Sequence, residues 1–145
     1  MADLIPPLPT KLQLLIVSAD RSLVNETVDE VEIPGAEGYF GVLPGHTPIL
    51  ALLGAGELWY RQGTKKHFLS MAFGFAEVQP DQVTILAEIA ERADEIDLAR
   101  AEAARKRAEE RLAKPTVDMD AERARISLLK SLIRIQVATK ARVRT

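Results

Sequence analysis

Apolar and polar residues over roughly the first two thirds of the chain alternate with the short period typical of β-strands. The segments that carry this pattern are 11–18, 28–33, 57–61, 67–71, 75–78 and 82–86. Gly63 and Pro80 stand in short polar connections between four of them, as expected for hairpin turns. Many short strands separated by turns with glycine or proline predict a β-sandwich or a flattened barrel.

Beyond Ile89 the pattern changes to the longer period of amphipathic helices. Residues 97–113 are strong helix formers and include no glycine or proline. Asp97 is a candidate N-cap for this helix, with Asp94 as an alternative. Pro115 is expected to end the helix, because proline cannot continue it.

A second helix is expected from Asp118 or Asp120 to about Ala138, antiparallel to the first because the connection is short. Each helix carries one apolar face, and that of the first helix is mostly alanine, which buries little apolar area. We therefore hypothesise a weakly docked hairpin that can exchange partners. The stripes are Ala101, Ala104, Ala108 and Leu112 in the first helix, and Ala121, Ala124, Leu128, Leu132 and Ile135 in the second.

The fold class is thus α+β, with a β-sandwich domain over residues 1–93 and a helical hairpin over residues 94–145. The 145 residues include no cysteine, which excludes disulfides, thiolate metal sites and cysteine nucleophiles. Two histidines leave little basis for a metal site, and none is expected. No apolar run approaches the length of a transmembrane helix, and the first residues do not resemble a secretory signal.

Charge divides the chain at the same place. Residues 1–93 hold 6 basic and 12 acidic residues, whereas residues 94–145 hold 13 basic and 9 acidic ones. No acidic residue follows Glu122. This asymmetry indicates two parts with different surroundings and an acidic partner for the basic end, although a solvated basic helix face gives the same pattern.

Three stretches together resemble the epsilon subunit of the bacterial F-type ATP synthase. They are GAEGYFGVLPGH at 35–46, EVQPDQVTILA at 77–87 and IDLARA at 96–101. The resemblance extends over residues 11–140, with the stretches in the family's order and at its separations. It implies a ten-stranded β-sandwich, or flattened barrel, followed by an antiparallel two-helix hairpin.

The resemblance also implies a function. The chain would be a non-catalytic central-stalk subunit of the proton-translocating enzyme, peripheral to the cytoplasmic face of the bacterial cell membrane. It would bind the gamma subunit and the c-subunit ring and couple the ring's rotation to the catalytic head. Its mobile hairpin would extend toward the catalytic β subunit and inhibit ATP hydrolysis.

No cofactor is required by this resemblance, but ATP is a possible regulatory ligand between the hairpin and the β domain. Guanidinium groups suit phosphate because they combine charge with paired donors. Lys130 stands where the clearest ATP binders of the family have arginine. Lysine keeps the positive charge but lacks the paired N–H donors of a guanidinium. The implied ATP-binding residues are Glu91, Asp97, Arg100, Ala101, Arg107, Lys130 and Arg134.

The resemblance places Glu37, Tyr39 and His46 on the surface that contacts the c ring, with Tyr39 at a position that is often acidic in relatives. In the extended hairpin, basic residues would contact an acidic segment of the catalytic β subunit. These implied contacts are Arg123, Arg125, Lys130 and Arg134.

The alternatives belong to other classes of protein. A nucleic-acid-binding module would use the basic end, but the whole chain is acidic and its aromatic residues lie far from that end in sequence, so no nucleic-acid partner is expected. An enzyme is not supported, because the sequence has no P-loop, dinucleotide fingerprint or triad-like set. His46 follows Pro44 and Gly45, and we interpret it as a turn or contact residue.

Overall fold

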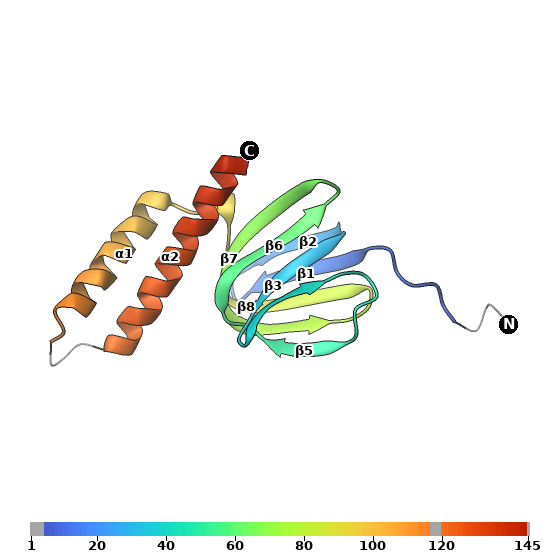
Figure 1. The fold of residues 1–145 in the computed structure, drawn as a ribbon, viewed down its shortest axis with the longest axis horizontal. Helices are drawn as coiled ribbons and strands as arrows, with labels where there is room; N and C mark the ends of the chain where they lie inside the picture. The colour runs from blue at the N-terminus through green and yellow to red at the C-terminus, as the bar shows by residue number, and fades with distance from the viewer. Residues whose placement is uncertain (1–4, 117–119, 145) are drawn as a thin grey trace.

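The computed structural model describes residues 5–116 and 120–144, with side chains described as far as Lys140 (Figure 1). A strand-rich body carries a pair of antiparallel helices on one side. The expected helix start at Asp118 lies outside the described residues. The elements are β1 (Leu12–Ser18), β2 (Ser22–Val28), β3 (Glu30–Gly35), β4 (Gly38–Val42), β5 (Ile49–Leu52), β6 (Ala55–Gln62), β7 (Lys65–Val78), β8 (Gln82–Arg92), the 3₁₀-helix η2 (Ala93–Glu95), α1 (Leu98–Ala113) and α2 (Ala121–Arg144).

The strands form one strongly curved sheet in the order β2-β1-β8-β7-β6-β3-β4, with β5 paired to β7. β1 and β8 run parallel, and all other pairs are antiparallel. The sheet folds back on itself, so that its β2 end meets β6. There the Asp29 amide donates to the Arg61 carbonyl at 2.8 Å, and the Gln62 side chain donates to Glu26 at 3.0 Å. The result is a flattened sandwich with the apolar core between its two layers.

β7 passes through both layers as a single long strand. Its first part pairs with β6 and its last part pairs with β5, and β8 follows it on the other side. Between these parts Phe73 and Gly74 have positive φ angles of 64° and 115°. A Cβ at Gly74 would lie 2.0 Å from the Leu86 carbonyl oxygen, so this position requires glycine.

The implied count of ten strands is corrected to eight in the described residues, because β7 and β8 each continue across both layers. Alternate side chains of β1 and of the first half of β8 point into the core, as their burial pattern shows. Its largest fully buried members include Leu12, Leu14, Ile16, Ile33, Leu58, Tyr60, Leu69 and Ile85.

The sequence predicted most of this sheet but missed β2, β4 and β5. β2 was missed because polar Asn25 and Glu26 interrupt its apolar positions. β4 holds two glycines in five residues, and β5 is short and mostly exposed. Pairing with neighbouring strands, rather than local pattern, forms these three strands.

Aspartates begin both helices. The Asp97 carboxylate accepts a hydrogen bond from the Arg100 amide at 3.1 Å, which confirms it as the N-cap of α1, while Asp94 lies in η2 instead. The Asp120 carboxylate accepts from the Arg123 amide at 3.1 Å in the same way. α2 continues to Arg144, beyond the expected end near Ala138, because no glycine or proline interrupts it.

The helices pack through small residues, as Ala101, Ala108 and Ala124 are all buried. Leu132, expected in the buried stripe, is 43% exposed, and that expectation is wrong. A different face of α2, which carries Ile133, Val137 and Ala138, packs against the sheet instead. A small separate cluster joins the two parts and contains Phe68, Ile96, Ile133, Val137 and Ala138.

Candidate functional site

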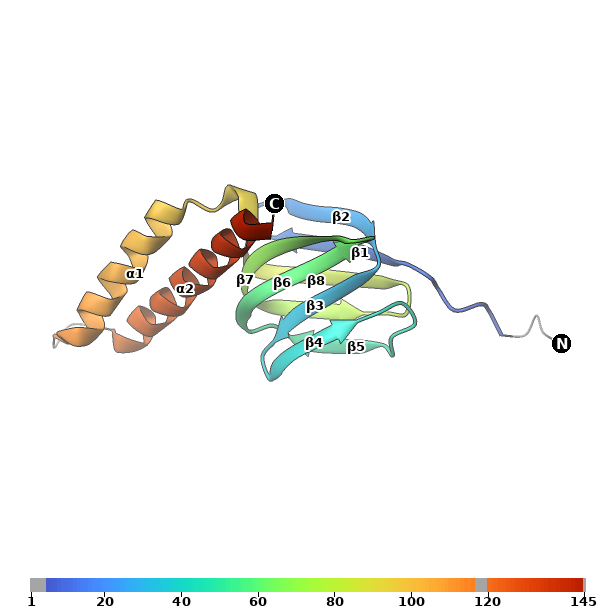
Figure 2. The same cartoon turned by 45° about the horizontal axis from the view of Figure 1, so that its top comes forward.

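A cavity of about 400 Å³ lies between the hairpin and the sheet. Ala72 and Ile89 line it from β7 and β8, and Ile126 and Lys130 line it from α2. The C-terminal part of α2 lies nearer the sheet than its N-terminal part does (Figure 1, Figure 2). An apolar hollow edged by a few charged groups is the usual form of a small-molecule site.

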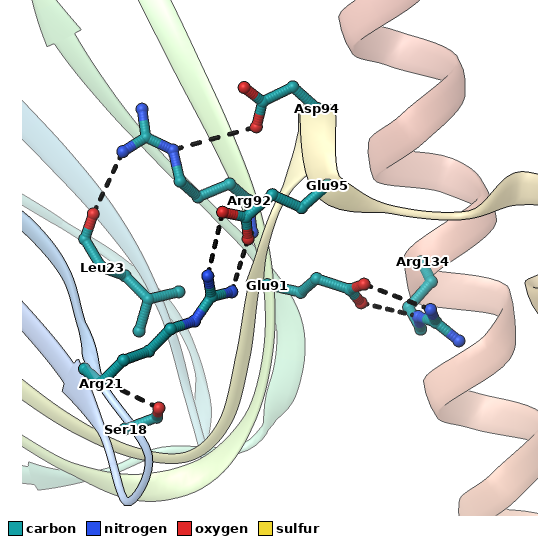
Figure 3. A network of polar contacts seen from close by, with 8 residues as sticks. All are labelled: Ser18, Arg21, Leu23, Glu91, Arg92, Asp94, Glu95 and Arg134. Atoms are coloured by element: carbon teal, nitrogen blue, oxygen red, sulfur yellow. Dashed lines mark hydrogen bonds and ion pairs between the residues drawn. The ribbon is translucent and has the colours of Figure 1, made fainter.

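Glu91 and Arg134 form the strongest polar contact at this cavity (Figure 3). The Arg134 Nε donates to one carboxylate oxygen at 2.8 Å, and its Nη2 donates to the other at 3.2 Å. Each side chain is 24% exposed, so the pair is partly shielded from water. The fork-to-fork geometry fixes both groups and joins α2 directly to the end of β8.

A second set of ion pairs holds η2, the segment between the sheet and the hairpin (Figure 3). Arg21 binds the Glu95 carboxylate through both terminal nitrogens, with one contact at 3.0 Å. Arg92 donates to the Leu23 carbonyl at 3.1 Å, and its Nε lies 3.9 Å from Asp94. The hydrogen bond from Arg21 holds the pKa of Glu95 below its usual value. The base of the hairpin is thereby fixed to β2 and the turn before it.

The residues implied for ATP binding are brought together only in part. Glu91, Lys130 and Arg134 all line the cavity. Ala101 is buried between the helices. Asp97, Arg100 and Arg107 are exposed on α1 or its cap, outside the cavity lining, and the Asp97 carboxylate is engaged in capping.

The basic side chains of α2 that the structure describes mostly lie near groups of this chain. The Lys130 ammonium lies 5.8 Å from the centre of the Phe73 ring, and Arg123 lines the cavity. Arg125 makes an exposed ion pair with Glu122 at 3.4 Å. Such surface pairs contribute little to stability, so Arg125 remains available for other contacts.

Sequence reasoning missed one contact near the end of α2. Glu57 on β6 is only 5% exposed. Gln136 donates to its carboxylate at 3.2 Å, and the Lys140 ammonium lies 3.1 Å away. Two features of the sequence could have indicated this contact. One is an acidic residue within the predicted strand 57–61, and the other is the absence of acidic residues after Glu122. The acidic β domain therefore supplies partners that the basic end lacks in sequence.

Glu37, Tyr39 and His46 lie around β4. Glu37 and Tyr39 are at its start and His46 is in the loop after its end, so the structure does not gather them at one point. The Tyr39 hydroxyl oxygen accepts a hydrogen bond from the Glu57 amide at 3.1 Å, although the side chain is 56% exposed. His46 Nδ1 donates to the Thr47 carbonyl at 2.7 Å.

Two other kinds of site are absent from the part of the chain that the structure describes. Within residues 5–116 and 120–144, no three histidine or acidic side chains gather in a way that could hold a metal ion. In the same residues, no helix has the length and apolar character needed to span a membrane.

Comparison with known protein families matches the chain in two consecutive parts. Residues 11–93 match the β-sandwich domain of the ATP synthase delta/epsilon chain, and residues 94–139 match its long α-helix domain. The ATP synthase epsilon chain of Solibacter usitatus is 43% identical over 133 residues, which cover 92% of this chain and 99% of the relative. That of Syntrophobacter fumaroxidans is 48% identical over 130 residues, covering 90% and 97%.

Solved structures agree on the fold. A chain in the mitochondrial ATP synthase of Euglena gracilis, in a structure of OSCP, F1 and the c ring, aligns with a TM-score of 0.70 and 24% identity over 95% of this chain and 84% of that one. A chain from the central stalk and c ring of the Tetrahymena thermophila enzyme gives a TM-score of 0.52 at 13% identity, covering 93% and 98%.

Proposed function

The chain belongs to the delta/epsilon chain family of ATP synthase, and from this membership we propose that it works as the central-stalk epsilon subunit of an F-type ATP synthase. Its role is to couple rotation of the c ring to the catalytic head during proton translocation. It performs no catalytic step itself. It is peripheral to the membrane, at the cytoplasmic face, and is held there by the complex.

The β-sandwich is the part that joins the rotor, with the gamma subunit and the c ring as partners. Glu37, Tyr39 and His46 are the proposed c-ring contacts. Leu52, Phe75 and Leu86 support a subunit interface, because they are paired neighbours across β5, β7 and β8 and are 61%, 49% and 51% exposed. An apolar row of this kind is typical of a surface that another protein covers.

The hairpin is the regulatory part. Its docking rests on a small apolar cluster and on the ion pairs of Arg134 and Lys140 with the acidic β domain. An alternative acidic partner can compete for the same cations. We assign that role to the catalytic β subunit, contacted in the extended state by Arg123, Arg125, Lys130 and Arg134. Salt should weaken this attraction at exposed positions.

ATP is the proposed regulatory ligand of the cavity under α2. Lys130 and Arg134 are two of the three cations that line it in the described part of the chain, the third being Arg123, and Glu91 occupies the Arg134 fork when no anion does. A triphosphate would compete with Glu91 for that fork. Asp97, Arg100, Ala101 and Arg107 would join the ligand from α1, which requires α1 to shift from the arrangement described here.

The observation that carries this proposal is a family match that covers both the sandwich and the hairpin, together with a hairpin docked through few contacts. The test is ATP hydrolysis by the reconstituted enzyme with the full chain or with a chain ending at Ala93. The shortened chain should join the complex and sustain proton-coupled synthesis but lose inhibition of hydrolysis. Equal inhibition by both chains would contradict the regulatory role, and failure of both to join the complex would contradict the stalk role.

A further inference from the structure

A second and larger cavity, about 850 Å³, lies at the tip of the β6–β7 turn and is separate from the one under α2. It is lined by Thr64 of the turn, by the first residues of β7, by Arg92 at the end of β8 and by Asp94 in η2. No role proposed above uses this cavity. Among the described residues, its lining holds the cations Lys65, Lys66 and Arg92 and one carboxylate, that of Asp94.

We propose that this cavity binds a small phosphate-bearing anion, held by Lys65, His67 and Arg92. This site is independent of the nucleotide proposed for the cavity under α2, since Arg134 and Glu91 do not line it.

His67 provides the directional contact. Its ring stacks on that of Tyr60, the residue paired with it in the sheet, with ring centres 4.8 Å apart and planes 19° from parallel. This stacking fixes the direction of the imidazole nitrogens. The Nε2 atom is buried and has no hydrogen-bond partner among the described residues. Leaving such a group unpaired costs about 1–3 kcal/mol. Because Nε2 is closed to solvent in this arrangement, an anion oxygen would remove that penalty only after the side chains that cover Nε2 move aside.

The charges around His67 come from several elements. Burial, and next Lys65, lower the pKa of His67, so its neutral form is favoured when the cavity holds only solvent. The carboxylate of Glu26 on β2 accepts a hydrogen bond from the Tyr60 hydroxyl at 3.3 Å. Burial raises the pKa of Tyr60 to about 12, so the hydroxyl stays a neutral donor. Arg92 completes the set of cations on the side of η2.

The Arg92 side chain is held in place, but not all of its N–H donors are used. It donates through Nη1 to the Leu23 carbonyl, and its Nε lies 3.9 Å from Asp94, whose side chain is 81% exposed. A guanidinium carries five N–H donors, so others remain for a ligand. The Lys66 ammonium lies 3.9 Å from the centre of the Trp59 ring, which makes Lys65 the freer lysine.

Phosphate suits this arrangement better than a carboxylate peptide does. Residues that carry an ammonium, a guanidinium and an imidazole line one cavity, and a phosphate group offers several oxygens to meet such groups at once. The Thr64 hydroxyl adds a neutral donor on the same turn. A carboxylate offers only two oxygens and would satisfy part of this set.

The experiment is an NMR titration of the full chain with inorganic phosphate and with pyrophosphate, at constant ionic strength set by chloride. The chain has only two histidines, so His46 is an internal control for the imidazole signals. We expect saturable shifts at the His67 ring with no shift at His46. No saturable change, or parallel changes at both histidines, would overturn the proposal.

Variants identify the donors. Replacing Lys65 by Ala alters an exposed side chain, so the fold should be retained, and we expect about tenfold weaker pyrophosphate binding from the loss of one charge-assisted contact. His67→Phe keeps the stacked ring and removes Nε2, with a similar loss expected. Arg134→Gln is the matched control for the other cavity and should leave this binding unchanged. Equal binding by wild type and Lys65→Ala, or a loss caused by Arg134→Gln, would contradict the assignment.

Discussion

Val137 offers the clearest measurement of how the hairpin is held. It is fully buried in the cluster that joins α2 to the sheet. Val137→Ala removes two buried methyl groups, worth about 1.6 kcal/mol at about 0.8 kcal/mol each. Alanine is the better helix former by about 0.5 kcal/mol, which opposes the loss. The docking free energy should therefore fall by about 1 kcal/mol, which corresponds to about a fivefold change in the opening equilibrium.

The assay is native-state amide hydrogen exchange, which reports opening residue by residue. Amides of α2 near Val137 should exchange about fivefold faster in the variant, while those of β7 and β8 should keep their protection. Leu129→Ala is the matched control, because Leu129 lies on the same helix and is 43% exposed. Leu129 is not part of the cluster that joins α2 to the sheet, so its replacement should change the docking free energy less.

Two outcomes would refute this reasoning. Equal acceleration in α2 and in the sheet would mean that the hairpin and the sandwich open as one unit. Unchanged protection in Val137→Ala would mean that the apolar cluster does not hold the hairpin, and that the ion pairs of Arg134 and Lys140 with the sheet do so instead.

Three further predictions concern the β domain and its connection to the hairpin. Tyr39→Phe removes the acceptor for the Glu57 amide and should lower the free energy of unfolding in urea by about 1 kcal/mol; an unchanged midpoint would show that the amide has another partner. Gly74→Ala adds a Cβ 2.0 Å from a carbonyl oxygen at positive φ and should lower the melting temperature by several degrees, about 1–3 kcal/mol; a wild-type melting curve would contradict this. Because the folded-state pKa of Glu95 is depressed, its stabilising contribution is present above its unfolded-state pKa and is lost as pH falls through the folded value. The free energy of unfolding in urea should therefore differ less between pH 7 and acidic pH in Arg21→Gln than in the wild type. The same pH dependence in both proteins would contradict this.

The sequence predicted the parts of the fold that depend on local chemistry. The N-cap at Asp97 and the turn at Gly63 follow from the side chain or backbone freedom of a single residue, and both occur where expected. Leu132 was placed wrongly because an apolar stripe does not say which side of a helix a sheet will cover. The strands that local pattern missed are those stabilised by their neighbours.

Some residues of the candidate site could be predicted from the sequence and others could not. The resemblance to the family implied Glu91 and Arg134, and the structure joins them in an ion pair across 43 residues of sequence. Glu57 was missed because its partners Gln136 and Lys140 are about eighty residues away, and no local pattern carries that information. Burial of a charged side chain becomes visible only when the sheet and helix are seen together.

The proposed regulatory role requires the hairpin to leave the sheet in order to inhibit ATP hydrolysis. Ile89 and Ile126 line the cavity from opposite sides, and the chain has no cysteine, so cysteines placed at these two positions can be joined by a bismaleimide. The measurement is ATP hydrolysis by the reconstituted enzyme, with the same variant treated with a monofunctional maleimide as the control. We predict that the joined chain loses inhibition while the control keeps it. Equal inhibition in both would contradict a regulatory hairpin.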